Sequence, residues 1–238
     1  MDKFLTGKRA IVTGGTRGIG RAIAESLLAA GSAVVICGRN GAALDVAVSE
    51  MKTKHGDRIH GRLCNVANAA EVSDFFATAQ SVLGGLDILV NNAGVGTFKS
   101  TADLTIEDWH RVLDTNLSGV FYCCHAALPT LKGQVGAYII NISSLAGKNA
   151  FAGAAAYNAS KFGLNGFSEA MMLDHRFDGV RVSYIMPGSV NTDFGSSKKD
   201  TSWMIDPADI ADIVMLLLQM PARTLVSRIE VRPTKPGK

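Results

Sequence analysis

Three residues whose side chains can exchange protons or form hydrogen bonds lie close together in the sequence: Ser144, Tyr157 and Lys161. Tyr157 and Lys161 are four residues apart in a predicted helix, so their side chains share one helix face. A free tyrosine titrates near ~10, and a neighbouring ammonium lowers that pKa by favouring the phenolate. Alone, such a pair is a common surface feature. With Ser144 thirteen residues upstream, the three residues predict an acid–base site.

A glycine-rich turn near the N-terminus suits a phosphate group. The first predicted strand runs directly into Thr13-Gly14-Gly15-Thr16-Arg17-Gly18-Ile19-Gly20, which opens the first predicted helix. Glycine is needed where the chain turns tightly and where backbone must approach a pyrophosphate. The start of a helix offers unpaired N–H groups and the positive end of its dipole. A turn of this kind also occurs without a ligand, but the strand before it and the helix after it favour nucleotide binding.

The elements that must position these residues alternate along the chain. Short runs rich in β-branched residues are separated by longer amphipathic segments. This alternation predicts an α/β fold, a doubly wound seven-stranded parallel sheet with helices on both faces. No linker divides the sequence, so residues 1–238 are predicted to form one domain. The predicted strands are Arg9–Thr13, Ala33–Cys37, Arg58–Cys64, Leu86–Val90, Gly136–Ile142, Val180–Met186 and Val226–Val231, and the predicted helices are Ile19–Ala30, Ala42–Lys54, Ala69–Leu83, Ile106–Leu131, Ala155–Phe177 and Pro207–Gln219.

The bulk composition excludes several classes of protein. No apolar run reaches the roughly 20 residues that a membrane helix needs. The net charge is only +3, and its densest spots, Lys198-Lys199 and the Arg232/Lys235/Lys238 tail, form no basic stripe for nucleic acid. The four cysteines and five histidines include no C-x-x-C and no H-E-x-x-H pattern. We therefore expect a cytoplasmic protein with free thiols and no metal site.

Further motifs identify a family. Asn91-Asn92-Ala93-Gly94 follows the fourth predicted strand, Ser143-Ser144 ends the fifth, and Pro187-Gly188 follows the sixth. Together with the T-G-x-x-x-G-x-G turn, Asn116 and the Y-x-x-x-K pair, this set resembles the short-chain dehydrogenase/reductase family over residues 8 to about 230. The resemblance implies a nicotinamide-dependent oxidoreductase on a single Rossmann domain.

The resemblance implies a role for each of four residues. Tyr157 would protonate a carbonyl oxygen while hydride passes from the nicotinamide to the carbonyl carbon. Lys161 would lower the pKa of that tyrosine and contact the cofactor ribose. Ser144, rather than Ser143, would hold the substrate oxygen. Asn116 matches the family asparagine whose backbone position holds a water in a relay to Lys161, although an asparagine within a helix can also merely cap a kink.

The end of the second predicted strand favours NADP(H) over NAD(H). NAD-selective Rossmann enzymes carry an acidic residue there that binds the ribose hydroxyls, whereas this strand is followed by Gly38-Arg39. A guanidinium can bind a 2′-phosphate through two charge-assisted hydrogen bonds. Arg17, inside the glycine turn, adds a second cation on the same side. Both arginines could instead be ordinary surface residues.

The resemblance extends the predicted cofactor site to further positions. Asn65-Val66 stands where the family usually has aspartate and valine near the adenine. Asn92–Gly94 would line the adenosine ribose, and Val190 and Thr192 would fix the carboxamide. The full predicted set is Gly14, Thr16, Arg17, Gly18, Ile19, Gly20, Arg39, Asn65, Val66, Asn92, Ala93, Gly94, Tyr157, Lys161, Pro187, Gly188, Val190 and Thr192.

The predicted activity is NADP(H)-dependent reduction of a small ketone or 3-oxoacyl-type carbonyl to a secondary alcohol. A serine hydrolase would need a G-x-S-x-G elbow, which the sequence lacks. A catalytically weak NADP-binding regulatory or sensing protein on the same fold stays open, because fold does not fix function. The polar run Ser196–Asp200 predicts a mobile segment. Candidate substrate contacts are Val95, Phe98, Leu145, Phe151, Phe194, Trp203 and Met204.

The predicted assembly is a homodimer or homotetramer. In the family, the long helices around Asn116 and Lys161 usually pair with a second subunit. The C-terminal sequence from Arg228 to Pro236 departs from the glycine-rich ending of many relatives. It is similar to the ending of some 3-hydroxy-acid dehydrogenases of the family.

Overall fold

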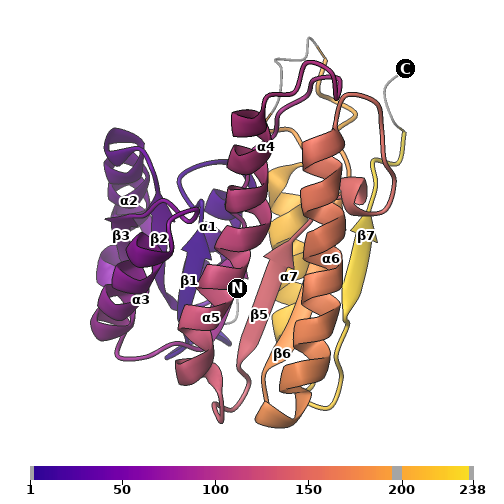
Figure 1. The fold of residues 1–238 in the computed structure, drawn as a ribbon. Coiled ribbons are helices and arrows are strands. Elements are labelled where there is room, and N and C mark those ends of the chain that lie inside the picture. Colours follow the sequence, from indigo (N-terminus) through magenta and orange to yellow (C-terminus); the bar gives the residue numbers. More distant parts are fainter. Residues whose placement is uncertain (1–2, 195–199, 236–238) are drawn as a thin grey trace.

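The computed structural model describes residues 3–194 and 200–235. Seven strands form one parallel sheet in the order β3-β2-β1-β4-β5-β6-β7 (Figure 1). The predicted seven-stranded parallel sheet is therefore confirmed, and each predicted strand is present with ends shifted by at most two residues. The strands are β1 (Arg9–Thr13), β2 (Ala33–Gly38), β3 (Ile59–Leu63), β4 (Ile88–Asn91), β5 (Tyr138–Ile142), β6 (Arg181–Pro187) and β7 (Arg228–Val231).

Helices cover both faces of the sheet, as predicted. Successive residues of a strand point to opposite faces, so Val12 packs in one buried cluster with α1, α2 and α7, while Ile11 packs in another with α3, α5 and α6. Figure 1 shows α5 and α6 side by side over one face. The helices are α1 (Gly18–Ala29), α2 (Gly41–His55), α3 (Ala69–Leu83), α4 (Ile106–Leu113), α5 (Gly119–Leu131), α6 (Ala155–His175) and α7 (Pro207–Gln219), with short 3-10 turns at Gly56–Arg58, Leu145–Gly147 and Arg176–Asp178.

The strand order places a topological switch point between β1 and β4. β1 pairs with β2 on one side and with β4 on the other. After β1 the chain therefore continues toward one edge of the sheet, and from β4 onward it continues toward the other edge. In open parallel sheets, ligands bind outside the carboxyl ends of the strands at such a switch point. The glycine-rich turn follows β1, and α6 begins at the same edge of the sheet (Figure 1).

The predicted helix Ile106–Leu131 is wrong as a continuous α-helix. A π-helical turn, Asp114–Ser118, separates α4 from α5. Gly119 lies immediately after that turn, where a Cβ would stand 2.7 Å from the carbonyl oxygen of Val66. The close approach of the loop after β3, together with hydrogen bonds made by Asn116, accounts for the irregular turn.

Several sequence-based expectations concern residues that the structure does not describe. Lys198-Lys199, most of the polar run Ser196–Asp200, Pro236 and Lys238 lie outside the described residues. Within the described ranges, no helix is long and apolar enough to cross a membrane. All four cysteines are buried as free thiols.

Candidate active site

Ser144, Tyr157 and Lys161 come together at the carboxyl edge of the sheet. Ser144 follows β5, and its Oγ accepts a hydrogen bond from the backbone N–H of Ala146 at 3.1 Å. Tyr157 and Lys161 lie in the first two turns of α6. The Ser144 hydroxyl is hydrogen-bonded to the Tyr157 phenol. The buried Lys161 Nζ lies 5.9 Å from the centroid of the Tyr157 ring and donates to the carbonyl oxygen of Ile142 at 2.9 Å.

Burial is the main influence on both titrating groups. It raises the pKa of Tyr157 above its usual value, and the hydrogen bond with Ser144 opposes that rise. Burial also lowers the pKa of Lys161 to about 8. The sequence predicted a lowered pKa for Tyr157, and this is wrong for the site as it stands, because desolvation disfavours the phenolate more than its surroundings stabilise it.

Asn116 is buried, and its side chain holds the loop after β4. Its Oδ1 accepts from the backbone N–H of Val95 at 2.8 Å, and its Nδ2 donates to the carbonyl oxygen of the same residue at 2.8 Å. The same Nδ2 lies 3.1 Å from Ser160 Oγ on α6. Asn116 thus connects the π-helical turn, the substrate-side loop and the helix that carries Tyr157.

The glycine-rich turn is shaped by positions where a side chain would be strained or blocked. Gly14 and Gly18 have φ angles of 65° and 55°, in the left-handed region that favours glycine. At Gly20 a Cβ would overlap the amide nitrogen of Asn92 and the carbonyl oxygen of Gly14. Helix α1 begins with no side-chain cap and no acidic residue in its first turn, so its end presents unpaired N–H groups.

The Thr13 hydroxyl, whose role the sequence reasoning missed, joins the ends of β1 and β4. Its oxygen accepts from the backbone N–H of Asn92 at 3.0 Å and from that of Ala93 at 3.1 Å. Asn92 Nδ2 in turn donates to the carbonyl oxygens of Thr13 and Gly14, both at 3.0 Å. The signal was present, since threonine opens the turn motif, but its bonding partners lie far along the chain.

The predicted phosphate-binding arginines occupy different surroundings. Arg39 follows β2, is exposed, and forms no ion pair within the described residues. The glycine turn is close by, because a Cβ on Gly38 would stand 2.9 Å from Cγ2 of Thr16. Arg17 instead lies 3.6 Å from Asp193 Oδ2, with both side chains largely exposed. Only Arg39 is therefore an uncommitted cation at the predicted position.

Asn65 and Val66 lie in the loop after β3, beside the end of β2. The backbone N–H of Asn65 donates to Glu71 Oε2 at 2.9 Å, and its Oδ1 accepts from Ala67 at 3.3 Å. Val66 is buried. The Asn65 side chain is thus partly used to shape its own loop.

The turn after β6 lies against the glycine-rich turn. A Cβ on Gly18 would meet Thr192 Cγ2 at 3.1 Å, so the two segments are in close contact. The backbone N–H of Gly188, directly after Pro187, donates to the carbonyl oxygen of Val231 at 2.8 Å. Val190 forms an isolated parallel bridge with Ile205.

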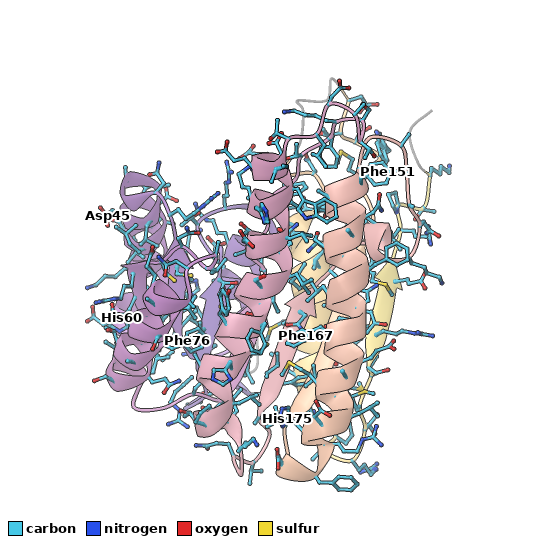
Figure 2. All side chains as sticks on the ribbon, viewed as in Figure 1. Asp45, His60, Phe76, Phe151, Phe167 and His175 are labelled. Carbon is cyan, nitrogen blue, oxygen red and sulfur yellow. The ribbon has the colours of Figure 1, made fainter. Side chains whose placement is uncertain are left out.

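Three of the predicted substrate contacts gather around Tyr157. The Phe98 ring lies 5.6 Å from the Tyr157 ring, and the Phe194 ring lies 5.7 Å from it. Phe151 stacks on Phe98 at 6.1 Å, and Figure 2 shows it near the N-terminal end of α6. Among the other candidates, Val95 is held by Asn116, Leu145 lies beside Gly188, Met204 donates to Thr201, and Trp203 lies next to it in the chain.

Two asparagines on α6 fix the loop after β5, and sequence reasoning missed both. Asn158 Nδ2 donates to the carbonyl oxygen of Ala146 at 2.6 Å, and Asn165 Nδ2 donates to that of Gly147 at 3.0 Å. Asn165 Oδ1 also accepts from the Ser143 hydroxyl. Ser143 is thus a satisfied strand-end residue, as predicted. The loop that carries Ser144 is held to the helix that carries Tyr157.

The residues present fit a dinucleotide cofactor. A side chain at Gly14, Gly18 or Gly20 would fill or block the cradle, and the uncapped start of α1 suits a phosphate. The guanidinium of Arg39, which has no ion-pair partner among the described residues, stands at the end of β2. Among the described residues, no group of three His, Cys, Asp or Glu side chains could hold a metal ion.

Comparisons with known proteins agree with this geometry. A family model described as short chain dehydrogenase matches residues 8–203. An uncharacterized oxidoreductase of Staphylococcus aureus (strain MW2) is 34% identical over 230 residues, which cover 96% of this chain and 98% of the relative.

Two solved structures extend the comparison. A metagenomic short-chain oxidoreductase in complex with NADP is 36% identical, with a TM-score of 0.86 and coverage of 98% of this chain and 99% of that one. An alcohol dehydrogenase from the archaeon Thermococcus sibiricus, complexed with 5-hydroxy-NADP, is 28% identical, with a TM-score of 0.90 and coverage of 97% and 99%.

Proposed function

The chain belongs to the short-chain dehydrogenase family, and we propose that it is an NADP(H)-dependent oxidoreductase that reduces a small ketone or 3-oxoacyl-type carbonyl to a secondary alcohol. The observation that carries the proposal is the grouping of Ser144, Tyr157 and Lys161 at the edge of the sheet where the glycine-rich turn also lies. The reaction is reversible, with the alcohol oxidised in the opposite direction.

In this proposal Tyr157 is the proton donor. Its raised pKa keeps the phenol protonated at neutral pH, which is the state that carbonyl reduction requires. Ser144 holds the substrate oxygen, and its hydrogen bond to Tyr157 aligns the phenol with that oxygen. When bound, the reduced nicotinamide would supply the hydride that the carbonyl carbon accepts.

Lys161 and Asn116 support the proton transfer. The pKa of Lys161, about 8, leaves it mainly protonated at neutral pH. A protonated ammonium next to the Tyr157 ring stabilises the phenolate left after proton donation. Asn116 is proposed to place a water on the relay that returns a proton through Lys161, with its side chain fixed by Val95 and Ser160.

The preference for NADP(H) rests on the end of β2. A carboxylate there would repel a 2′-phosphate, whereas Arg39 offers an exposed guanidinium that pairs with no acidic group in the part of the chain that the structure describes. The similar metagenomic oxidoreductase was solved with NADP and the Thermococcus sibiricus enzyme with 5-hydroxy-NADP. The remaining cofactor contacts are proposed at the glycine turn, Asn65–Val66, Asn92–Gly94 and the Pro187–Thr192 turn.

We also infer that residues 1–238 act as one domain that assembles into a homodimer or homotetramer. Helices α5 and α6 expose Phe121, Phe162 and Leu173, apolar side chains that suit contact with a second copy. Four buried free thiols suit a reducing compartment such as the cytoplasm.

Turnover of a ketone panel by wild type and Tyr157→Phe tests the proposal. The variant keeps the ring contacts with Phe98 and Phe194 but lacks the donor, so its rate should fall ~10²–10⁴-fold while NADPH binding survives. The panel contains ketones, 3-oxoacyl thioesters and hydroxy acids, and turnover of each compound is followed by the absorbance of the nicotinamide. If the variant kept more than about a tenth of the wild-type rate, Tyr157 would not be the general acid.

The same assay addresses the competing interpretation. Tight NADPH binding without turnover of any compound in the panel would favour a regulatory or sensing protein. The double variant Tyr157→Phe/Lys161→Ala should be little slower than either single variant, because residues that act as one unit have non-additive effects.

A further inference from the structure

We propose that the substrate is a ketone with an uncharged aryl group next to its carbonyl, and that Phe98, Phe151 and Phe194 bind this aryl ring. These three residues are called the aromatic wall below. This inference rests on the proposed carbonyl reduction, and it names the class of substrate.

Phe98 is the centre of the wall. Its ring stacks on Phe151 at 6.1 Å with an interplanar angle of 29°, and meets Phe194 edge-on at 6.4 Å and 80°. It also meets Tyr157 edge-on at 5.6 Å, while Phe194 meets Tyr157 at 5.7 Å. The three contacts of Phe98 have the stacked and edge-to-face geometries that aromatic rings prefer. A planar substrate ring that packs against the aromatic wall would therefore lie directly beside Tyr157, the proposed proton donor.

The wall is incomplete as a hydrophobic cluster. Phe98, Phe151 and Phe194 are 47%, 52% and 45% exposed. One half-exposed phenylalanine is ordinary on a protein surface. Three such rings, two of them in contact with Phe98 at the centre, form an apolar surface that a ligand can cover next to a partly buried tyrosine with a perturbed pKa.

The backbone around the wall is fixed before any ligand binds. The isolated bridge between Lys99 and Ala154 joins the Phe98 loop to the start of α6. Asn158 Oδ1 accepts from the backbone N–H of Phe151 at 3.3 Å. At Gly96 a Cβ would stand 2.9 Å from the Phe98 ring and 3.1 Å from the Phe194 ring. Glycine at this position thus allows the two rings to approach each other.

The charged side chains next to Phe98 are already paired. Lys99 Nζ lies 2.7 Å from Asp108 Oδ2, and Arg111 donates to Thr97 and lies 3.5 Å from Asp108 Oδ1. A substrate carboxylate placed here would compete with Asp108 for both cations. An uncharged aryl group needs neither cation, and ring contacts alone account for its binding.

The experiment compares three methyl ketones that differ in one substituent. Acetophenone carries a phenyl ring, cyclohexyl methyl ketone a saturated ring of similar size, and butan-2-one only an ethyl group. Values of kcat/KM are measured with NADPH for wild type, Phe98→Ala and Gly96→Ala. Phe177→Ala is the control, because Phe177 is 95% exposed and follows His175 at the opposite end of α6 (Figure 2).

Acetophenone should be the best substrate and butan-2-one the poorest. Phe98→Ala should lower kcat/KM for acetophenone about tenfold, that for cyclohexyl methyl ketone less, and that for butan-2-one by less than about twofold, because ring contacts act only on a ring. Gly96→Ala keeps all three rings but separates them, so it should reproduce the loss for acetophenone. Phe177→Ala should change none of these values.

Three results would overturn the inference while the proposed reaction stands: equal efficiency for acetophenone and butan-2-one, a Phe98→Ala effect of the same size on all three ketones, or a strong preference for charged 3-oxo acids. If no ketone is reduced, the proposed reaction is wrong. Calorimetric measurement of acetophenone binding then tests separately whether the aromatic wall binds an aryl ring. Acetophenone should bind the NADPH complex of Tyr157→Phe about tenfold more tightly than that of Tyr157→Phe/Phe98→Ala. Equal binding, or none, rejects the wall.

Discussion

On the glycine-turn side of the site, partly buried polar groups form hydrogen bonds with one another, whereas on the aromatic-wall side half-exposed rings lie on loops. On this glycine-turn side, called the cofactor side below, Asn92 alone makes two side-chain hydrogen bonds to backbone carbonyls at 3.0 Å. Among the described residues, the Phe98 side chain makes ring contacts and no hydrogen bond on the other side. Hydrogen bonds and excluded Cβ positions fix a geometry closely, while ring contacts tolerate changes of shape.

This difference suggests how one family serves many substrates. The cofactor side must present the same backbone to an unchanging dinucleotide, so its glycines and Asn92 leave little freedom. The wall can change one ring at a time without disturbing the sheet, because its residues belong to loops on a rigid scaffold. Changes on the cofactor side should therefore affect all substrates alike, and at its tightly packed positions they should also affect stability. Changes in the wall should affect selected substrates.

The largest effect is expected from Lys161→Met. This substitution removes a buried charge, so it should raise the free energy of unfolding at neutral pH. The pKa of Lys161 falls from its ordinary 10.5 to about 8, so burial of the ammonium costs ~3 kcal/mol of unfolding free energy. The cost is complete below about pH 8, where both folded and unfolded states are protonated. It disappears as the pH rises toward the unfolded pKa, because only the unfolded state then binds the proton.

Urea unfolding of both proteins between pH 7 and 10.5 measures this effect. The difference in unfolding free energy between Lys161→Met and wild type should fall by ~3 kcal/mol as the pH rises over that range. A loss of about 1 kcal/mol from the hydrogen bond to Ile142 offsets the gain at every pH. Turnover should collapse in the variant. A stability difference independent of pH would contradict a depressed pKa for Lys161.

The next effect concerns a single methyl group on the cofactor side. Gly20→Ala should cost about 2–3 kcal/mol of stability and weaken NADPH binding, because overpacking strains the surroundings. The added Cβ would overlap Asn92 Nδ2 and the carbonyl oxygen of Gly14. Gly41→Ala is the matched control, since Gly41 starts α2 and its added Cβ would reach only Leu63 at 4.0 Å.

Thermal unfolding and NADPH titration of the two variants provide the measurements. Gly41→Ala should be neutral or slightly stabilising. If Gly20→Ala behaved like Gly41→Ala, the cofactor side would be less tightly constrained than its hydrogen bonds indicate, and the contrast between the two sides would be lost.

The cofactor side was also the more predictable side from sequence. Gly14, Gly18 and Gly20 occur in one short run between a predicted strand and a predicted helix, so this local context predicted the turn. Tyr157 and Lys161 share a helix face for the same local reason. The strand–helix alternation likewise predicted the sheet, because each element carries its own hydrophobic pattern.

What sequence missed depends on contacts between distant segments. Thr13 bonds Asn92, and Asn158 bonds Ala146 across a loop, which no local pattern specifies. The π-helical turn at Asn116 requires the loop after β4 to supply bonding partners. The raised pKa of Tyr157 was missed because burial, which outweighs the neighbouring groups, is a property of the folded chain.

The smallest expected effect is Arg39→Asp, which tests whether the cofactor side selects NADPH by charge. Arg39 is exposed, so its hydrogen bonds to a 2′-phosphate are partly screened by water and salt. The substitution should lower NADPH affinity by about 1–3 kcal/mol, the range for charge-assisted bonds, and leave stability unchanged. NADH affinity should stay constant or rise, because a carboxylate can accept from the ribose hydroxyls.

Arg17→Ala provides the matched comparison for this last prediction. Because Arg17 already lies 3.6 Å from Asp193, its loss should weaken NADPH binding less than the loss of Arg39. Titrations with both cofactors at two salt concentrations separate the charge effect, since only the contribution of the phosphate falls with ionic strength. Equal NADPH affinity in wild type and Arg39→Asp would show that the cofactor side recognises the dinucleotide through its backbone cradle, without help from this arginine.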